Sequence, residues 1–189
     1  MCTMRTGRRR WGAAGYTALE LAVGVAITGI LAGISLPNLV GTIQRYQGDA
    51  APRQLMGDLR YAQSQAIARG MEARVVIFDS AGQATIPGGA NLTDTTKANR
   101  YRVEVRPTGG AWPALTDTMA TNGNVLSEWL DLARDYRQSV TQANAVVFTS
   151  RGSLQNSASS LNIVLRGGSP SGVSSRTVRS HPSGQVEIL

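Results

Sequence analysis

The sequence predicts a mixed α+β protein, in which one long N-terminal helix precedes a domain of strands and turns. An apolar run from Leu21 to Leu36 without any ionisable side chain predicts the first part of the helix, and a stripe of apolar residues at helical spacing predicts its continuation. Beyond Gly70 the chain consists of short β-branched segments separated by turn-rich stretches, a pattern that indicates strands. The 189 residues suffice for one domain with an appendage.

The predicted helix covers residues 16–69. Its second half carries apolar residues at intervals of three and four, which mark one buried face. These residues are Leu55, Leu59, Ala62 and Ala66. Gly70 is a natural residue to end the helix. Gly29 and Pro37 are predicted weak points, because glycine loosens a helix and proline lacks an amide donor and clashes with the preceding turn.

The remaining chain is predicted to form strands joined by turns. The segments with a strand pattern are 73–78, 101–106, 145–149, 161–165, 176–180 and 185–189, of which the last two form a hairpin. Residues 126–136 are predicted as a short helix capped by Ser127, with a strand edge as the alternative. The segments predicted as loops or turns are 87–99, 108–123 and 167–175.

The basic character of the chain originates mainly in residues 1–15. The net charge is +7, from 19 basic and 12 acidic residues, and four of the arginines but none of the acids lie in this leader. Without the leader, 15 basic residues would face 12 acids, so the high charge says little about nucleic acid. Arginines before an apolar helix predict a cytoplasmic N-terminus and an exported remainder. Cys2, the only cysteine, also lies in the leader.

Glu20 is the only charged residue in the segment 16–37. On insertion scales, a carboxylate near the centre of a bilayer costs roughly 2.5–3.5 kcal/mol, and less toward the interface. An ordinary cleaved secretory signal is disfavoured, because the apolar run is long and lacks a small-x-small cleavage site at its end, whereas a plain signal anchor stays an alternative. Neither explains why the segment should retain a glutamate.

Residues 15–20, with the sequence Gly-Tyr-Thr-Ala-Leu-Glu, resemble the processing signal of type IV pilins and type II secretion pseudopilins. Tyr16 stands where the family usually has Phe. The resemblance implies that prepilin peptidase cleaves after Gly15 and methylates the new N-terminus at Tyr16. It also implies that Glu20 directs assembly, and it places Gly29 and Pro37 at the helix-weakening positions of the family.

Residues 54–78 resemble the stretch of GspH/FimT-type minor pilins and pseudopilins in which the helix runs into the first strand. The Phe-x-x-x-Gly turn at 148–152 and the Gly-x-Val-x-Ile ending at 184–188 extend this resemblance. It implies a pilin fold, a long N-terminal helix packed on a small antiparallel β-sheet domain. The implied division is a cleaved leader 1–15, a transmembrane and polymerisation helix 16–37, an amphipathic continuation 38–70 and a periplasmic β-rich head 71–189.

The implied function is that of a non-catalytic subunit of a type II secretion pseudopilus or a type IV pilus, placed near the tip. The implied partners are prepilin peptidase, other pilins, the inner-membrane assembly platform and the lipid of the inner membrane, in which the subunit resides before it joins the filament. No cofactor is implied.

Two further functions remain open. Some FimT-type pilins bind DNA during natural transformation through a Gly-Arg-x-Arg motif, which aligns with residues 184–187, where both arginines are missing. Arg166, Arg176 and Arg179 could still form a basic patch for nucleic acid. The other alternative is a membrane-anchored enzyme or binding protein of the envelope. His181, the single histidine, is expected to be a solvated turn residue, and neither a catalytic residue nor a metal site is predicted.

Overall fold

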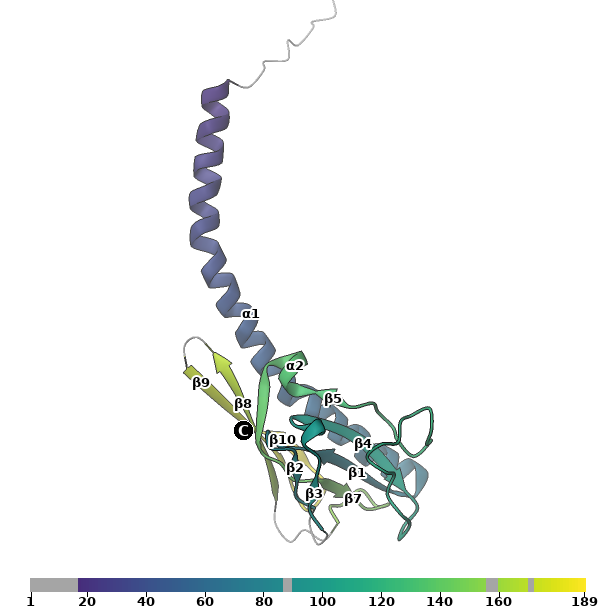
Figure 1. The fold of residues 1–189 in the computed structure, drawn as a ribbon. Coiled ribbons are helices and arrows are strands. Elements are labelled where there is room, and N and C mark those ends of the chain that lie inside the picture. Colours follow the sequence, from purple (N-terminus) through teal and green to yellow (C-terminus); the bar gives the residue numbers. More distant parts are fainter. Residues whose placement is uncertain (1–16, 87–89, 156–159, 170–171) are drawn as a thin grey trace, which may run out of the picture. The chain divides into compact units, whose positions relative to one another are not determined.

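The computed structural model describes residues 17–86, 90–155, 160–169 and 172–189; the side chains of 34–48, 168–169 and 172–174 are not part of that description. Figure 1 shows the fold. The elements are α1 (Ala18–Arg69), β1 (Glu72–Ile77), β2 (Gln83–Ala84), β3 (Leu92–Thr93), the 3₁₀-helix η1 (Thr95–Lys97), β4 (Arg100–Arg106), β5 (Leu130–Asp131), α2 (Leu132–Tyr136), β6 (Gln138–Gln142), β7 (Val146–Phe148), β8 (Leu161–Ser169), β9 (Gly172–Ser180) and β10 (Val186–Ile188). The chain divides into two units, Met1–Val40 and Gly41–Leu189, which are described separately.

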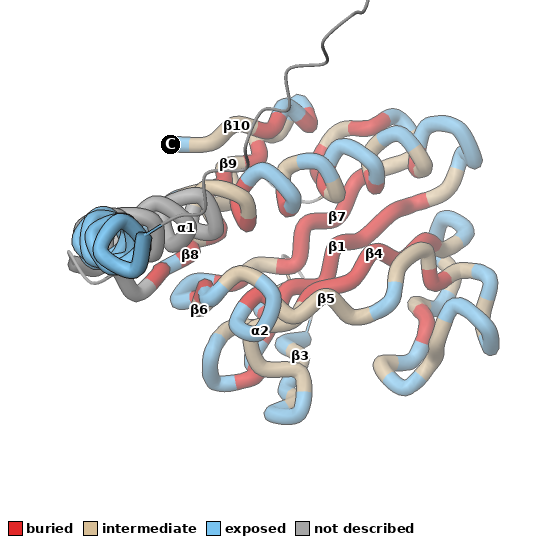
Figure 2. Tube along the Cα trace, turned by 90° about the horizontal axis from the view of Figure 1, so that it is seen from above, coloured by how far each residue is buried: buried red, intermediate tan, exposed pale blue. Residues whose placement is uncertain are grey.

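In the first unit, helix α1 exposes its side chains on every side. All residues from Thr17 to Gly33 are exposed, as the pale blue of Figure 2 shows. The large apolar side chains among them are 51% to 76% exposed, with Val23 at the lower and Leu19 at the upper end. Among the residues that the structure describes, no helix is long and apolar enough to cross a membrane.

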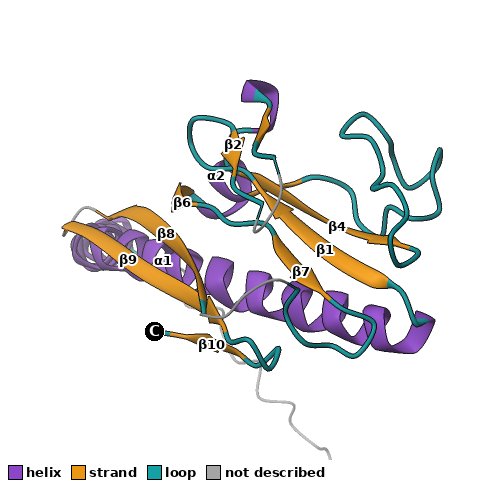
Figure 3. Cartoon of the chain, turned by 90° about the horizontal axis from the view of Figure 1, so that it is seen from below, coloured by secondary structure: helices purple, strands orange, loops and turns teal. Residues whose placement is uncertain are grey.

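The second unit, here called the head, packs the second half of α1 against antiparallel sheets. One sheet has the strand order β5-β4-β1-β7 and the other the order β10-β9-β8-β6, while β2 and β3 form a small ribbon. Figure 3 shows β7, β1 and β4 lying between α1 and loops on the far side of the sheet. All pairings between named strands are antiparallel, so the predicted α+β architecture is confirmed.

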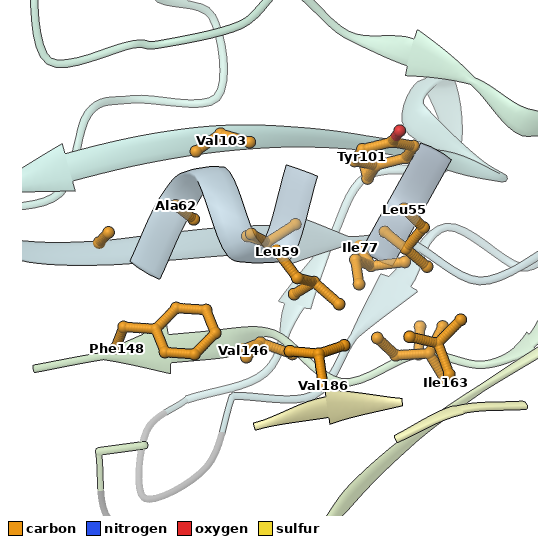
Figure 4. Packing of buried hydrophobic residues seen from close by; sticks show 14 of the residues in the cluster. Leu55, Leu59, Ala62, Ile77, Tyr101, Val103, Val146, Phe148, Ile163 and Val186 are labelled. Carbon is orange, nitrogen blue, oxygen red and sulfur yellow. The ribbon is translucent and has the colours of Figure 1, made fainter. Parts of the chain in front are cut away.

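The core lies between α1 and the two sheets. Leu55, Leu59, Ala62 and Ala66 are completely buried, as the stripe in the sequence predicts. Side chains from both sheets surround them in Figure 4, among them Ile77, Val103, Val146, Phe148, Ile163 and Val186. Each Å² of apolar surface removed from water contributes about 25 cal/mol to stability, so this shared core is the main source of the head's stability. The helix ends as predicted at Gly70, which has a φ of +61°.

The segment 167–175 was predicted as a turn, and this prediction is wrong. Strands β8 and β9 continue through most of it, in a register that pairs Gly167 with Ser174 and Ser169 with Gly172. The glycines and serines of this segment favour turns locally, but the ladder hydrogen bonds of a long hairpin outweigh that preference. The strand β6 was not predicted at all, because its sequence Gln-Ser-Val-Thr-Gln contains only one strongly apolar residue.

The short helix predicted at 126–136 is half as long as expected. Helix α2 begins only at Leu132, with the Oδ1 atom of Asp131 accepting a hydrogen bond from the backbone N–H of Arg134 as the cap. Ser127 is not a cap: its hydroxyl oxygen accepts a hydrogen bond from the backbone N–H of Val103 at 2.9 Å. The first half of the segment instead lies along the edge of β4, so the predicted alternative, a strand edge, is confirmed for that half. The segment 108–123 has no helix or strand, as predicted.

Candidate functional site

Glu20 lies in the first turn of α1 and is exposed. The Oγ1 atom of Thr17 accepts a hydrogen bond from the backbone N–H of Glu20 at 3.2 Å, and the carbonyl of Thr17 accepts one from Leu21, also at 3.2 Å. The pattern Thr-x-x-Glu at this position is that of a capping box, and a carboxylate in a first turn interacts favourably with the helix dipole. A negative charge is therefore held at the very start of an exposed apolar helix.

The other residues predicted for processing and assembly are less fully described. Gly15 and Tyr16 lie outside the described residues. At Gly29 a Cβ atom would meet no other atom within 4 Å, so this glycine leaves an open place on the helix surface. Pro37 lies within α1, in the stretch 34–48 whose side chains the structure does not describe.

The three arginines predicted as a basic patch do not share one face. Residues that pair across antiparallel strands lie on the same side of the sheet, and Arg176 pairs with the buried Leu165, so Arg176 is on the side of α1. There its Nη2 atom lies 3.0 Å from Oδ1 of Asp49. Arg166 and Arg179 lie on the opposite side, where Nη1 of Arg179 is 3.5 Å from Oε1 of Glu187.

His181 is half-buried rather than solvated, which corrects the sequence prediction. Its Nε2 atom lies 3.0 Å from Oε1 of Glu187 and its Nδ1 atom 3.1 Å from Oγ of Ser160. The alignment of Ser160, His181 and Glu187 has the residue types of a hydrolytic triad. However, Arg179 also pairs with the carboxylate of Glu187, which a triad would need for the histidine alone. The two contacts of His181 tie the C-terminal hairpin to the start of β8.

The outer face of β4 and β1 carries a buried ladder of charges that the sequence did not predict to be buried. Nε of Arg106 lies 2.7 Å from Oε2 of Glu72, and Glu104 accepts hydrogen bonds from both Arg74 and Arg102 at 2.5 Å. Arg102 and Glu104 are completely buried. Burial lowers the pKa of Arg74 below its ordinary value, an effect that Glu104 opposes.

Residues 107–129, here called the strap, cover this ladder. Arg102 holds the strap through its backbone: Nη2 donates to the carbonyl of Ala114 at 2.6 Å and Nη1 to that of Asp117 at 2.7 Å. Arg106 donates in the same way to Gly110 at 2.8 Å. Only an arginine has enough donors in a planar fork to serve a carboxylate and several carbonyls at once.

Two tryptophans complete the cover of the ladder. The guanidinium groups of Arg74 and Arg106 lie 4.4 and 4.3 Å from the ring centroid of Trp112. That of Arg102 lies 4.6 Å from the ring of Trp129. Such cation–π contacts suit cations that have lost their water. The only sequence signal for this cluster was the alternation of charges along β4, which on its own indicates a solvated face.

Two glycine turns press against α1 at the end of the head. The Nε2 atom of Gln63 donates to the carbonyl of Gly152 at 2.8 Å, and Gly184 packs against both of these residues. Gly184 has a φ of +89°, and a Cβ atom there would overlap the carbonyl of Gly152. These are the glycines of the Phe-x-x-x-Gly and Gly-x-Val-x-Ile patterns, so the patterns mark the points where both turns meet the helix.

Within the described ranges, no group of three or more His, Cys, Asp or Glu residues is placed to hold a metal ion. The described residues comprise an exposed apolar helix segment with one carboxylate, that of Glu20, and a head in which several charges pair with one another.

Comparison with known proteins gives the family. Residues 51–184 match the family described as Type II transport protein GspH, and the chain belongs to this family. Two crystal structures of the type IV minor pilin FimU from Pseudomonas aeruginosa (strain PAO1) are similar. One has 14% identity and a TM-score of 0.47 over 77% of this chain and 90% of that chain. The other has 13% identity and a TM-score of 0.43 over 75% and 91%. No curated protein matches the sequence significantly.

Proposed function

We propose that this protein is a minor pilin or pseudopilin, a structural subunit of a type II secretion pseudopilus or a type IV pilus that joins the filament near its tip and thereby supports protein secretion or pilus biogenesis. Prepilin peptidase cleaves it between Gly15 and Tyr16 and methylates the new N-terminus. The family match and the Gly-Tyr-Thr-Ala-Leu-Glu sequence at this junction support the proposal.

Before assembly, the segment 16–37 holds the subunit in the inner membrane, with its N-terminus cytoplasmic and its head periplasmic. The arginine-rich leader and the uncharged run from Leu21 to Leu36 support this orientation. In this state the lipid and the inner-membrane assembly platform are its partners, and in the filament other pilins replace the lipid.

Assembly depends on Glu20. A free α-amino group is mostly protonated at neutral pH, so cleavage creates a cation that the carboxylate of Glu20 on a neighbouring subunit can pair with. Pairing offsets the desolvation of both charges when the apolar helices pack together. The single observation that carries this mechanism is the placement of an exposed carboxylate in the first turn of a helix whose other exposed side chains, up to Gly33, are uncharged.

The substitution Glu20→Ala tests this mechanism. The variant should be cleaved and methylated normally but should be lost from purified filaments, measured by immunoblot of the sheared fraction. Thr28→Ala, in the same helix segment, is the matched control and should be incorporated normally. Normal incorporation of Glu20→Ala would refute the pairing mechanism.

DNA uptake has weaker support. Arg176 and Arg179 are engaged by acids of the same chain, and Arg166 lies apart from Arg176 on the other side of the sheet. A patch of free cations is what phosphate binding requires. A gel shift with the full chain in detergent at low salt checks this alternative, and we expect no binding.

A further inference from the structure

The head presents two unlike surfaces on opposite sides of the sheet β5-β4-β1-β7. Tyr101, Val103 and Val105 point from β4 toward α1, whereas Arg102 and Glu104 point toward the strap. The outward face of α1 and the outer surface of the strap are therefore separated by the sheet (Figure 3). Five exposed residues of this helix face are here called the helix stripe: Arg53, Gly57, Arg60, Tyr61 and Ser64.

The helix stripe is basic. Arg53 and Arg60 are exposed, and neither belongs to an ion pair among the described residues. The neighbouring Asp58 is already engaged, since its Oδ2 atom accepts hydrogen bonds from Tyr101 and Gln54.

An apolar anchor and a hollow accompany these arginines. Tyr61 is 42% exposed, and exposed tyrosines beside arginines are typical of binding hot spots. A shallow hollow of about 580 Å³ lies one turn away, lined by Asp49, Ala50, Arg53, Gln54 and Gly57. At Gly57 a Cβ atom would meet nothing within 4 Å, so a partner side chain can approach the backbone there.

The strap is acidic. The sequence 107–129 contains Asp117 and Glu128 and no lysine or arginine. A hydrogen bond from the side chain of Asn122 keeps the pKa of Asp117 below its ordinary value, so this carboxylate stays ionised. Met119 lies between the two acids: it is 49% exposed, and its backbone N–H donates to Oε1 of Glu128 at 3.3 Å. Methionine is an adaptable side chain at binding surfaces.

We propose that the strap of one copy of this chain docks on the helix stripe of a second copy. The carboxylates of Asp117 and Glu128 would face Arg53 and Arg60, and Met119 would enter the hollow at Gly57 beside Tyr61. Because the two surfaces lie on opposite sides of one head, the contact between the two copies is head-to-tail rather than symmetric. The inference rests on the proposed function as a filament subunit and adds the surface by which heads recognise each other.

A second copy fits these observations better than other occupants do. A nucleic acid would be attracted to the helix stripe but repelled by the strap, and it would leave the acids and Met119 without a role. A different pilin would need to supply an acidic surface that this chain already carries.

Disulfide trapping in membranes tests the proposal. Two differently tagged full-length chains are co-expressed, one with Ser64→Cys and one with Ala120→Cys, both exposed sites, and both carry Cys2→Ser so that no other thiol is present. Residues 16–189 carry both cysteine sites whether or not the leader is cleaved, so the result is independent of processing. Oxidation should give a disulfide-linked dimer that carries both tags. Co-expression of two chains with the same cysteine substitution should give at most a tenth of this yield of cross-linked dimer.

Charge reversal provides the second part of this cross-linking test. Arg53→Glu with Arg60→Glu in the Ser64→Cys chain should reduce cross-linking at least tenfold, and Glu128→Lys in the Ala120→Cys chain should restore part of it. Absence of the mixed cross-link, its persistence after charge reversal, or cross-linking only to another protein would overturn the proposal. The mass of the mature N-terminus in the same membranes tests the proposed function separately.

Discussion

Tyr101 joins the sheet to the helix through Asp58. Its buried hydroxyl donates a hydrogen bond of 2.6 Å to the Oδ2 atom of Asp58 on α1, while its ring packs in the core. A hydrogen bond from a buried donor to a charged acceptor contributes about 1.5–3 kcal/mol to stability. This contact therefore fixes the position of β4 on the helix, and with it the strap on the other side of β4.

Removing the hydroxyl tests this contact. Tyr101→Phe should lower the free energy of unfolding by roughly 1.5–3 kcal/mol, because Asp58 loses its buried donor. Chemical denaturation of the detergent-solubilised chain, followed by near-UV circular dichroism, measures the difference. Tyr61→Phe is the matched control, since Tyr61 is 42% exposed, and it should be nearly neutral. Equal effects of the two variants would contradict the assigned role.

The same contact predicts a loss of stability at alkaline pH. Burial, together with the neighbouring Asp58, raises the pKa of Tyr101 above its ordinary value. The folded state thus keeps a proton that the unfolded state loses above about pH 10, so stability is full below that pH and falls as the pH rises further, by up to about 1.4 kcal/mol per unit. Unfolding curves from pH 8 to 11 should show a steeper decline for the natural chain than for Tyr101→Phe. Parallel curves would contradict this linkage.

Arg102 should be the most sensitive residue of the head. Arg102→Leu leaves Glu104 with Arg74 alone and removes the donors from the carbonyls of Ala114 and Asp117. Breaking a buried ion pair costs about 3–5 kcal/mol. Hydrogen exchange should accelerate across the strap, and the environment of Trp129 should change in fluorescence.

Arg102→Lys should recover only part of this loss, because an ammonium group lacks the planar fork. Arg134→Leu serves as the control, since the Arg134 side chain is 78% exposed in its ion pair with Asp135, and surface pairs contribute about 0–1 kcal/mol. If hydrogen exchange in the strap is no faster in Arg102→Leu than in the natural chain, Arg102 does not hold the strap in place.

Gly184 should not tolerate a side chain. Gly184→Ala combines a φ of +89° with an overlap on the carbonyl of Gly152, so it should destabilise the head by about 1–3 kcal/mol. Thermal unfolding measures the effect. Gly123→Ala, where a Cβ atom would meet nothing within 4 Å, should change little. If both variants unfold at the same temperature, the turn does not press on α1 as described.

The elements with strong local patterns could be predicted from the sequence. The stripe at Leu55 to Ala66 has the helical period, and the β-branched run at 73–78 has the composition of a buried strand, so both were found within one residue of their positions. The processing residues Gly15 and Tyr16 and the assembly residue Glu20 were assigned from a short motif, and their roles stay predictions.

The rest depended on long-range contacts. In the sequence, the alternating charges on β4 indicate a solvated face. In the structure the strap covers these charges, and no local pattern in the sequence indicates the course of the strap. Strand β6 and the ends of β8 and β9 owe their conformation to ladder partners rather than to their own residues. The hydrogen-bond partners of His181 are Ser160 and Glu187, and only the final hairpin brings these residues together.

The mass of the mature N-terminus tests the central claim most directly. Mass spectrometry of the chain purified from membranes of a host with prepilin peptidase should show a polypeptide that begins at Tyr16 and carries one added methyl group. The same chain from cells without the peptidase should keep residues 1–15. An intact leader in the presence of the peptidase, or a cut beyond Pro37, would contradict the assignment as a pilin-type subunit.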